Sequence, residues 1–305
     1  MQTYYAIVTC RNSENDIEEA LLSIYNQSIQ PTYIIVVDDG STDNTSHILL
    51  DLESRIPCLY VITNPDLGYD IGRVVSNWNK AIQLTHDLGL EKTDLHMIAT
   101  DDTIYEKNYV EKIISFMSNN QNIVIASGTY DANKFSTPLG AGRLINNSFF
   151  ENTQKFYPEI MGYESFILYA ARYQGYDYAV VNTARFEHTR KLGSDHNFYD
   201  WGQSMKALGY HPLFVLSRCL VYFVRDKPIG RIGPIIMLYK YLTYRPKKEG
   251  YYSLYQKEVR DYISNIQINQ MKKNIKNFIL RKLNNVSILN LTEKLGFSNL
   301  KNMKT

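Results

Sequence analysis

The sequence predicts an α/β protein in which helices flank a mostly parallel β-sheet. Short apolar runs without polar alternation, such as residues 34–37 and 96–100, are typical of strands that are buried on both faces. These runs alternate along the chain with segments that repeat apolar residues at helical spacing. Because such strand–helix–strand units connect in a right-handed, parallel manner, we expect the strand ends to meet at one edge of the sheet.

The predicted elements alternate in chain order. Strands are expected at residues 4–9, 34–37, 59–63, 96–100, 123–127 and 178–186. Helices are expected at residues 14–26, 42–53, 72–84, 108–118, 162–175 and 200–208. In the first helix, for example, Ile17, Leu21 and Ile24 share one face. Residues 129–158 show no regular pattern and are predicted to form an irregular substrate loop.

Charge is unevenly distributed along the chain. Residues 227–305 hold 16 Lys and Arg against 4 Asp and Glu, whereas residues 1–226 hold 17 against 27. The character of the sequence also changes after Pro228, where an apolar segment with basic edges precedes a polar, Lys-rich helical stretch. We therefore predict a globular body at residues 1–226, with halves at 1–127 and 128–226, and a basic helical extension at 227–305.

The basic extension points to an anionic partner. An anionic membrane surface is one candidate, and a solvated tail is the alternative. Residues 230–245 have an apolar centre, several Tyr and basic ends, which suits either an interfacial helix or packing against the body. The tail contains no recognisable nucleic-acid-binding module, so we expect no nucleic-acid partner. The sequence contains no run of eighteen apolar residues, so we expect no membrane-spanning helix.

Cysteine usage bears on the cellular compartment. Cys10, Cys58 and Cys219 lie far apart, without metal-ligand spacing, and their odd number favours a reducing environment. The first residues lead directly into a strand rather than into the apolar segment of a signal peptide. We therefore expect a cytoplasmic protein, and the basic extension suggests a peripheral position at the inner face of the membrane.

Two predicted strands end in adjacent carboxylates, Asp38–Asp39 and Asp101–Asp102, and a third ends near His188. In an open parallel sheet, ligands bind beyond the carboxyl ends of the strands. Carboxylate oxygens suit Mg²⁺ or Mn²⁺, Mn²⁺ also accepts imidazole, and a divalent cation in turn suits a diphosphate. Helix capping is the alternative role for the acids, and a hydrogen bond within a loop is the alternative for His188.

The stretch Val36-Val37-Asp38-Asp39-Gly40-Ser41-Thr42-Asp43-Asn44-Thr45 resembles the nucleotide-binding signature of inverting GT-A glycosyltransferases of family two. The similarity extends over residues 4–225 and includes Thr100-Asp101-Asp102, which resembles the metal-binding acidic motif. The resemblance implies a Rossmann-like GT-A fold. It also implies the transfer of one sugar from a nucleotide-diphosphate sugar to a lipid-linked or surface-glycan acceptor.

The resemblance also implies roles for individual residues. The residues expected to bind the nucleotide-sugar are Arg11, Asp38, Asp39, Gly72, Arg73, Asn77 and Asp101. Asp101 would also ligate Mn²⁺ or Mg²⁺, with Asp102 and His188 as further ligands. Arg190 and Lys191 are candidates for neutralising the diphosphate, although a charged surface loop explains them equally well.

Glu164, at the start of the helix predicted at 162–175, is the expected catalytic base for the acceptor hydroxyl. Two positions depart from the family pattern: Ala99 stands where the acidic motif usually begins, and Ser165 replaces the second acid beside Glu164. A catalytically weak or inactive sugar-nucleotide or glycan binder is therefore the alternative function. A sugar nucleotidyltransferase is a further alternative, but residues 9–16 lack the glycine-rich phosphate loop that such an enzyme normally needs.

Overall fold

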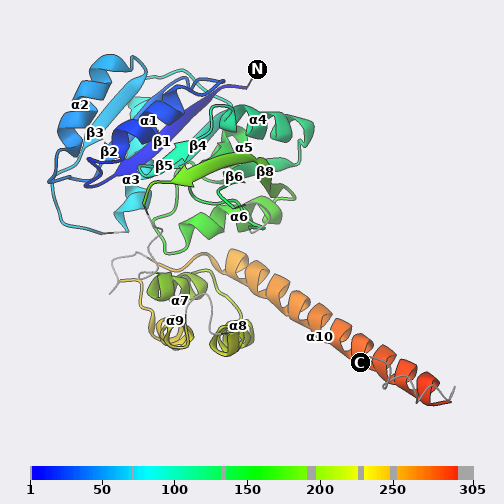
Figure 1. The fold of residues 1–305 in the computed structure, drawn as a ribbon. Helices are drawn as coiled ribbons and strands as arrows, with labels where there is room; N and C mark the ends of the chain where they lie inside the picture. The colour runs from blue at the N-terminus through cyan, green and yellow to red at the C-terminus, as the bar shows by residue number, and fades with distance from the viewer. Residues whose placement is uncertain are drawn as a thin grey trace, which may run out of the picture.

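The computed structural model describes residues 2–70, 72–131, 135–190, 197–225, 230–247 and 253–294. Within these residues a central sheet has the strand order β3-β2-β1-β4-β7-β6-β8-β5 (Figure 1). The strands are β1 Tyr4–Cys10, β2 Ile34–Asp38, β3 Leu59–Thr63, β4 Leu95–Thr100, β5 Thr103–Tyr105, β6 Ile123–Thr129, β7 Arg143–Asn146 and β8 Asp177–His188. The helices are α1 Ile17–Tyr25, α2 Thr45–Arg55, α3 Arg73–Asp87, α4 Tyr109–Asn119, α5 Asn147–Thr153, α6 Tyr163–Tyr173, α7 Asn197–Ala207, α8 Pro212–Arg225, α9 Ile232–Thr243 and α10 Lys257–Lys294.

The sheet confirms the predicted α/β class. Strands β1 to β4 are parallel, and their carboxyl ends lie at one edge of the sheet. β7 runs antiparallel between β4 and β6, while β8 is parallel to β6 and antiparallel to β5. The first half of the chain therefore forms the parallel, crevice-bearing part of the sheet, and the second half extends it as a mixed sheet.

Alternating side chains of each central strand enter two separate cores. On β2, Ile34 and Val36 pack with α1, α2 and α4, whereas Ile35 and Val37 pack with α3, α5 and α6. All four side chains are fully buried, which explains why this strand shows no polar alternation. Burial of each such side chain contributes about 2 kcal/mol, so the strand is firmly held and its carboxyl end is a fixed point for a site.

The prediction of an irregular loop at 129–158 is wrong in part. Residues 143–146 form β7, and residues 147–153 form α5, whose first turn is capped by the side chain of Asn146. The three-residue strand β5 was also not predicted. These elements are short, and pairing with distant strands rather than local periodicity determines them.

The division at residue 227 does not match the packing of the helices. Helix α9, which follows residue 227, packs on α7 and α8, which precede it. Figure 1 shows these three helices together below the sheet. We call α7, α8 and α9 the helical unit. The beginning of α10 packs against α6 and α8, and the helix then runs away from the body. None of the helices in the described ranges has the length and apolarity that a bilayer crossing requires. Residues 295–305 of the predicted extension lie outside the described residues.

Candidate active site

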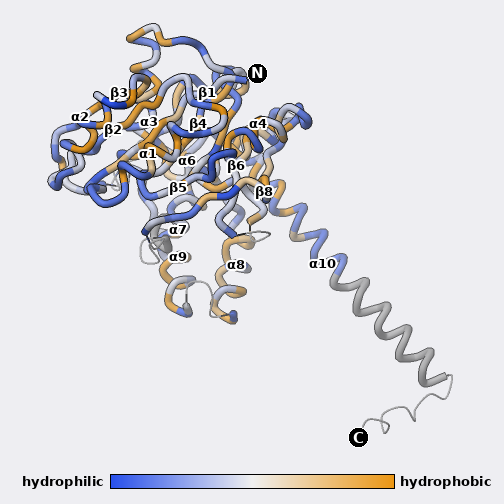
Figure 2. The backbone as a smooth tube through the Cα atoms, turned by 45° about the horizontal axis from the view of Figure 1, so that its top comes forward, coloured by the Kyte–Doolittle hydropathy of each residue, from blue (hydrophilic) through white to orange (hydrophobic). Residues whose placement is uncertain are grey.

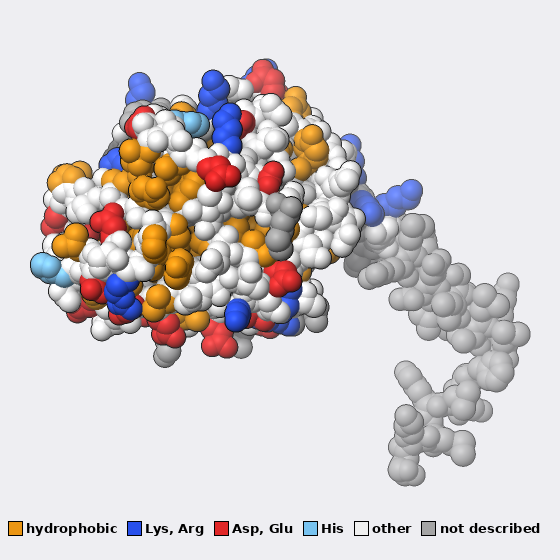
Figure 3. All heavy atoms as spheres, turned by 90° about the horizontal axis from the view of Figure 1, so that it is seen from above, with side chains coloured by type: hydrophobic (Ala, Val, Ile, Leu, Met, Phe, Trp, Pro, Cys, Tyr) orange, Lys and Arg blue, Asp and Glu red, His pale blue; other side chains and the backbone are white. Residues whose placement is uncertain are grey.

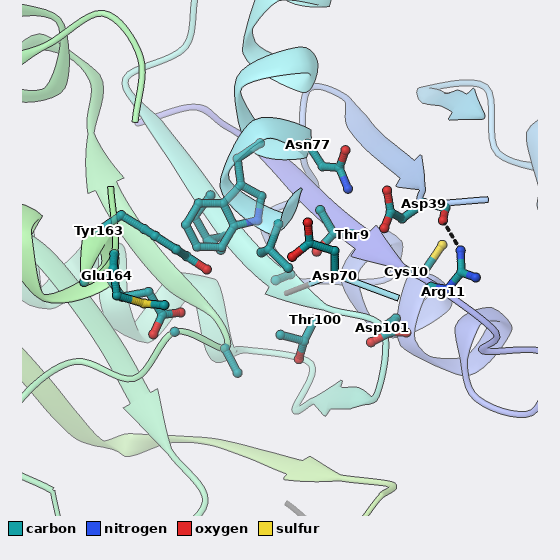
Figure 4. A pocket seen from close by; sticks show the side chains of 18 of the residues that line it. Thr9, Cys10, Arg11, Asp39, Asp70, Asn77, Thr100, Asp101, Tyr163 and Glu164 are labelled. Atoms are coloured by element: carbon teal, nitrogen blue, oxygen red, sulfur yellow. Dashed lines mark hydrogen bonds between the residues drawn. The ribbon is translucent and has the colours of Figure 1, made fainter. Parts of the chain in front are cut away.

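A cavity of about 580 Å³ opens at the carboxyl ends of β1, β2 and β4. One side, which we call the sheet-side wall, is formed by residues 9–11, Asp39 and residues 98–101. The opposite side, which we call the α6-side wall, is formed by Gly140, Ala141 and residues 161–165. Figure 4 shows Asp39, Arg11 and Asp101 at one end and Glu164 at the other. Helix α3 and helix α7 complete the lining.

The carboxylate of Asp39 is held by a network on the sheet-side wall. Arg73 donates to both carboxylate oxygens from Nε, at 3.1 Å to each, and also from Nη2 at 2.9 Å. Asn64 donates to Asp39 and to Asn77, and its own side-chain oxygen accepts from Lys80. Burial opposes ionisation of Asp39, but the hydrogen bonds from Arg73 and the amides outweigh it, so the pKa of Asp39 is lowered. Asn64 together with Arg73 and Asn77 of α3 therefore fixes an ionised acid at the cavity.

Asp38 does not reach the cavity. Its carboxylate is fully buried and accepts hydrogen bonds from the Ser41 backbone and from the hydroxyls of Ser41 and Ser46. Gly40 completes this turn with φ of +73°, and an added Cβ there would lie 2.6 Å from the Asp66 backbone. The expectation that Asp38 contacts a ligand is therefore corrected, because this acid holds the turn that presents Asp39.

Arg11 and the loop before α3 border the same end of the cavity. Arg11 donates to the carbonyl oxygens of Asp39 and Gly40 and forms an ion pair with Asp66 at 2.8 Å. Asn77 lines the cavity directly, whereas Arg73 reaches it only through Asp39. Gly72 is the residue before α3 and does not line the cavity.

Asp101 and Asp102 follow β4, as expected, and both face the guanidinium of Arg190. Arg190 Nη2 lies 2.8 Å from Asp101 Oδ1, and its Nε lies 3.8 Å from Asp102 Oδ2 and 3.2 Å from Asp16 Oδ2. Asp101 also accepts a hydrogen bond from Ser13. Burial raises the pKa of Asp101, and the contacts with Ser13 and Arg190 only partly offset this. The carboxylates of Asp16, Asp101 and Asp102 thus converge on the guanidinium of Arg190.

His188 lies behind Asp102 rather than in the cavity. Its Nδ1 lies 3.1 Å from the hydroxyl of Thr103 and 3.6 Å from Asp102 Oδ1. Burial would raise the pKa of Asp102, but the hydrogen bond from His188 and other neighbours lower it overall. In the part of the chain that is described, no three His, Cys, Asp or Glu side chains form a ready metal cluster. The carboxylates of Asp101 and Asp102, which already face the guanidinium of Arg190, nevertheless provide the hard oxygen ligands that a divalent cation prefers. Lys191 lies outside the described residues.

Glu164 occupies the first turn of α6, on the wall opposite Asp39 and Asp101. Its side chain is exposed to the cavity, and no hydrogen bond or ion pair from the described residues reaches its carboxylate. Its backbone carbonyl, in contrast, accepts a hydrogen bond from Arg143 at 3.0 Å. Gly140 leaves the room that the carboxylate needs, because an added Cβ would lie 2.7 Å from Glu164 Oε1. The helix start is therefore fixed while the carboxylate remains available.

Several lining residues were not predicted as site residues. Trp78 on α3 packs edge-on against Tyr157 and Tyr163, and its buried Nε1–H has no acceptor among the described residues. Trp201 and Ser204 on α7 also line the cavity. Aromatic residues make up 13% of the sequence and include 25 Tyr, which was the available signal, but many of the aromatic side chains belong to the core. Only the fold distinguishes those at the cavity.

A mixed sheet with a crevice at the ends of its parallel strands, flanked by helices, defines a GT-A nucleotide-diphospho-sugar transferase fold. The family model for glycosyl transferase family 2 matches residues 5–173. The chain belongs to this family, as its sequence signature predicts.

Two curated relatives, both uncharacterised glycosyltransferases of Haemophilus influenzae (strain ATCC 51907 / DSM 11121 / KW20 / Rd), are similar to part of the chain. One is 31% identical over 124 residues, which cover 41% of this chain and 35% of the relative. The other is 27% identical over 129 residues, which cover 41% of this chain and 45% of the relative. The matches thus span less than half of either relative.

Solved structures share the fold at low sequence identity. A mannosyltransferase from Pyrobaculum calidifontis in complex with GDP-Man and Mn²⁺ is 15% identical, with 79% of this chain and 69% of that chain covered and a TM-score of 0.55. Glucosyl-3-phosphoglycerate synthase from Mycobacterium tuberculosis, in complex with Mn²⁺, UDP and glucosyl-3-phosphoglycerate, is 15% identical. That match covers 67% of this chain and 78% of that chain, with a TM-score of 0.50. These likenesses show the fold.

Proposed function

We propose that this chain transfers one sugar, with inversion, from a nucleotide-diphosphate sugar to a hydroxyl of a lipid-linked or surface-glycan acceptor. The observation that carries the proposal is the opposition of two walls across one cavity. Held acids, Asp39 and Asp101, occupy the sheet-side wall, and the Glu164 carboxylate, which has no partner among the described residues, occupies the α6-side wall. This separation suits a donor bound on one side and an acceptor activated from the other.

The donor is assigned to the sheet-side wall. Asp39 is kept ionised by Arg73, so its carboxylate is a fixed acceptor for N–H and O–H groups of a base and ribose. Asp101, with Asp102, would hold Mn²⁺ or Mg²⁺, which would neutralise charge on the departing diphosphate. Two GT-A neighbours are bound to Mn²⁺ together with GDP-Man or UDP, which supports a nucleotide donor with a divalent cation.

Glu164 is assigned as the base. The acceptor oxygen attacks the anomeric carbon as the bond from that carbon to the diphosphate oxygen breaks. The acceptor proton passes to the Glu164 carboxylate, and the nucleoside diphosphate leaves with the bonding electrons. Because a single displacement inverts the anomeric carbon, one base suffices, and Ser165 beside Glu164 is not required to act as a second acid.

A donor screen tests this proposal. The full chain is incubated with UDP- and GDP-sugars and Mn²⁺, with and without membranes as an acceptor source, and released nucleotide is measured. We expect release from at least one donor and its loss in Asp101→Asn, whereas Asp87→Asn, an exposed acid outside the cavity, retains it. Unchanged release by a folded Asp101→Asn variant would contradict the assignment.

Ser165 favours a second candidate function, binding of a sugar nucleotide without transfer. Serine cannot supply the second acid that the family pattern places there, so Glu164 acts alone or no transfer occurs. Titration of the same nucleotide-sugars, followed by measurement of released nucleotide, separates the two functions. Saturable binding without release from any donor, in the presence of membranes, would establish the second.

A further inference from the structure

Helices α8 and α9 each expose a stripe of large apolar side chains. On α8 the stripe consists of Leu213, Leu216, Leu220 and Val224, and on α9 it consists of Ile232, Ile235, Tyr239 and Leu242. The three- and four-residue spacing places each set on one helix face. Exposed fractions run from 43% to 81%, and ten of the seventeen large exposed apolar side chains of the described residues lie on these two helices. We call these eight residues the hairpin patch.

The opposite faces of the same helices are buried. Val215 and Cys219 of α8 and Met237 and Tyr241 of α9 form one small core with Met205 of α7. The residues of the apolar stripes are therefore distinct from the residues that form the core of the helical unit. The unit already has a core, and the stripes are additional exposed apolar surface. Exposed apolar surface of this extent is typical of an interaction surface.

The charged side chains of α8, α9 and the described residues that adjoin them are all basic. The described residues 212–225 and 230–247 contain no Asp or Glu, whereas exposed basic side chains are present at Arg225, Arg231, Arg245 and Lys247. The face of the molecule seen from above, in contrast, shows acidic and basic side chains interspersed (Figure 3). Apolar stripes flanked by these positive charges are complementary to an anionic lipid surface. A second copy of the same patch would bring these positive charges against one another.

The position of the patch relates it to the cavity. Figures 1 and 2 show α8 and α9 below the sheet domain, and Figure 2 shows both helices in mostly hydrophobic colours. Helix α7 places Trp201 and Ser204 in the cavity lining, and it packs against α9. At Gly202 of α7, an added Cβ would lie only 2.3 Å from the Met237 carbonyl oxygen of α9, so the two helices are in close backbone contact. One rigid connection therefore links the patch to the cavity.

We propose that the hairpin patch docks this protein on the surface of an anionic lipid bilayer. The apolar stripes enter the interfacial region, and the flanking basic side chains contact lipid phosphates. Docking then holds the cavity, through α7, at the height of a hydroxyl that is anchored in the same bilayer. This last step rests on the proposed function and selects a membrane-anchored acceptor over a soluble one.

Vesicle co-sedimentation of the full chain tests the docking surface without donor or acceptor. We expect binding to vesicles that mix phosphatidylglycerol with phosphatidylcholine, weaker binding to phosphatidylcholine alone, and a decrease with added salt. The double variant Leu220→Glu with Ile235→Glu should lower vesicle affinity at least tenfold. Arg225→Gln and Arg231→Gln should each lower it about fivefold. Leu50→Glu on α2, where the native side chain is 67% exposed, is the matched control and should bind as the native chain does.

Three results would overturn the docking surface. These are no binding to anionic vesicles, equal loss in Leu50→Glu, and full binding by the folded Leu220→Glu with Ile235→Glu variant. A concentration-dependent dimer that this double variant abolishes, without vesicle binding by the native chain, would assign the patch to a second copy instead. Nucleotide release from the donor screen, measured in detergent-free solution, reports on the proposed function separately. Vesicle binding without release from any donor, in the presence of membranes as an acceptor source, would reject that function and leave the docking surface standing.

Discussion

The two walls of the cavity treat their carboxylates in opposite ways. On the sheet-side wall Asp39 is gripped by Arg73, and Asp101 is contacted by both Ser13 and Arg190. Behind this wall the Asp38 carboxylate accepts hydrogen bonds from the hydroxyls of Ser41 and Ser46. On the α6-side wall, by contrast, the Glu164 carboxylate receives no hydrogen bond from the described residues. The carboxylates of the sheet-side wall are therefore held in place, whereas the α6-side wall carries a carboxylate without a described partner, as the base role proposed for Glu164 requires.

The surroundings of each carboxylate explain why chemically identical groups are expected to have different roles, one in binding and one in proton transfer. The Asp39 carboxylate, which is tied to the Arg73 guanidinium, stays ionised and fixed, which suits recognition but lowers its basicity. A base must instead accept a proton during the reaction, so strong fixed donors would oppose its task.

The largest effect is expected for Glu164→Gln. The amide keeps the shape of the side chain but cannot accept the acceptor proton, so we expect kcat to fall roughly 10²–10⁴-fold. The KM for the nucleotide-sugar should stay near its native value, because the sheet-side wall is untouched. Steady-state kinetics with an accepted donor measure both, and Glu53→Gln, an exposed acid on α2, is the matched control. A large rise in donor KM with kcat preserved would assign Glu164 to donor binding instead.

Asp101→Asn should follow, with a loss of roughly 10²–10³-fold in transfer. The amide retains a partner for Ser13 but removes the negative charge that faces Arg190 and a bound cation. We also expect the affinity for Mn²⁺ to fall, and titration calorimetry with the metal alone reads this without turnover. Native Mn²⁺ affinity in the variant would show that Asp101 does not hold the metal.

His96 lies in the contact between the two halves of the body, residues 1–127 and 128–226, and its titration tests that contact. This fully buried imidazole on β4 contacts Asn147 Oδ1 at 2.6 Å and the Tyr157 hydroxyl at 2.7 Å, both in the second half. Burial lowers the pKa of His96 from its ordinary value of 6.5 to about 4. Between these pH values the unfolded chain binds a proton that the folded protein excludes, so stability falls as the pH decreases through this range.

The difference between the two pKa values of His96 corresponds to about 3 kcal/mol of unfolding free energy. This contribution is fully present above the ordinary pKa and is lost as the pH falls toward about 4. Urea unfolding across this range should show a steeper loss for the native chain than for His96→Gln, which cannot titrate. Parallel curves for the two proteins would show that His96 is not held neutral by burial.

The smallest effect is expected for Trp78→Phe. The buried Nε1–H of Trp78 has no acceptor among the described residues, and we expect it to donate to a sugar hydroxyl bound in the cavity. Loss of one neutral hydrogen bond of about 1 kcal/mol should raise the KM of one sugar substrate roughly fivefold. The affinity for free nucleoside diphosphate should not change, because the indole is not part of the network that holds Asp39. A change in nucleotide affinity alone would place Trp78 on the nucleotide.

Local patterns were enough to predict the sheet-side wall. The buried runs before Asp39 and Asp101 identify strands, and parallel topology brings strand ends together. The same patterns did not show which of two adjacent acids faces the cavity. Successive side chains point to opposite faces of a strand, and only the packing of the β2–α2 turn decides that Asp38 is the inner one.

Other features depend on contacts between distant parts of the chain. Strand β7 forms only by pairing with β4 and β6, so the run at 143–146 looked irregular in the sequence. The helical unit is held by side chains on both sides of residue 227, which a change in charge composition does not reveal. The unpredicted contact of Arg190 with Asp101 likewise joins residues that are far apart in sequence.

Nucleotide binding by wall variants tests the separation of the two walls most directly. Titration calorimetry of UDP and GDP with Mn²⁺ is performed on the native chain, on Arg73→Ala and on Glu164→Gln. We expect Arg73→Ala, which releases Asp39, to weaken binding of the preferred nucleotide by roughly tenfold or more. We expect Glu164→Gln to bind it as the native chain does. Native nucleotide affinity in Arg73→Ala, together with weakened nucleotide binding in Glu164→Gln, would contradict the assignment of donor binding to the sheet-side wall and of the base to the α6-side wall.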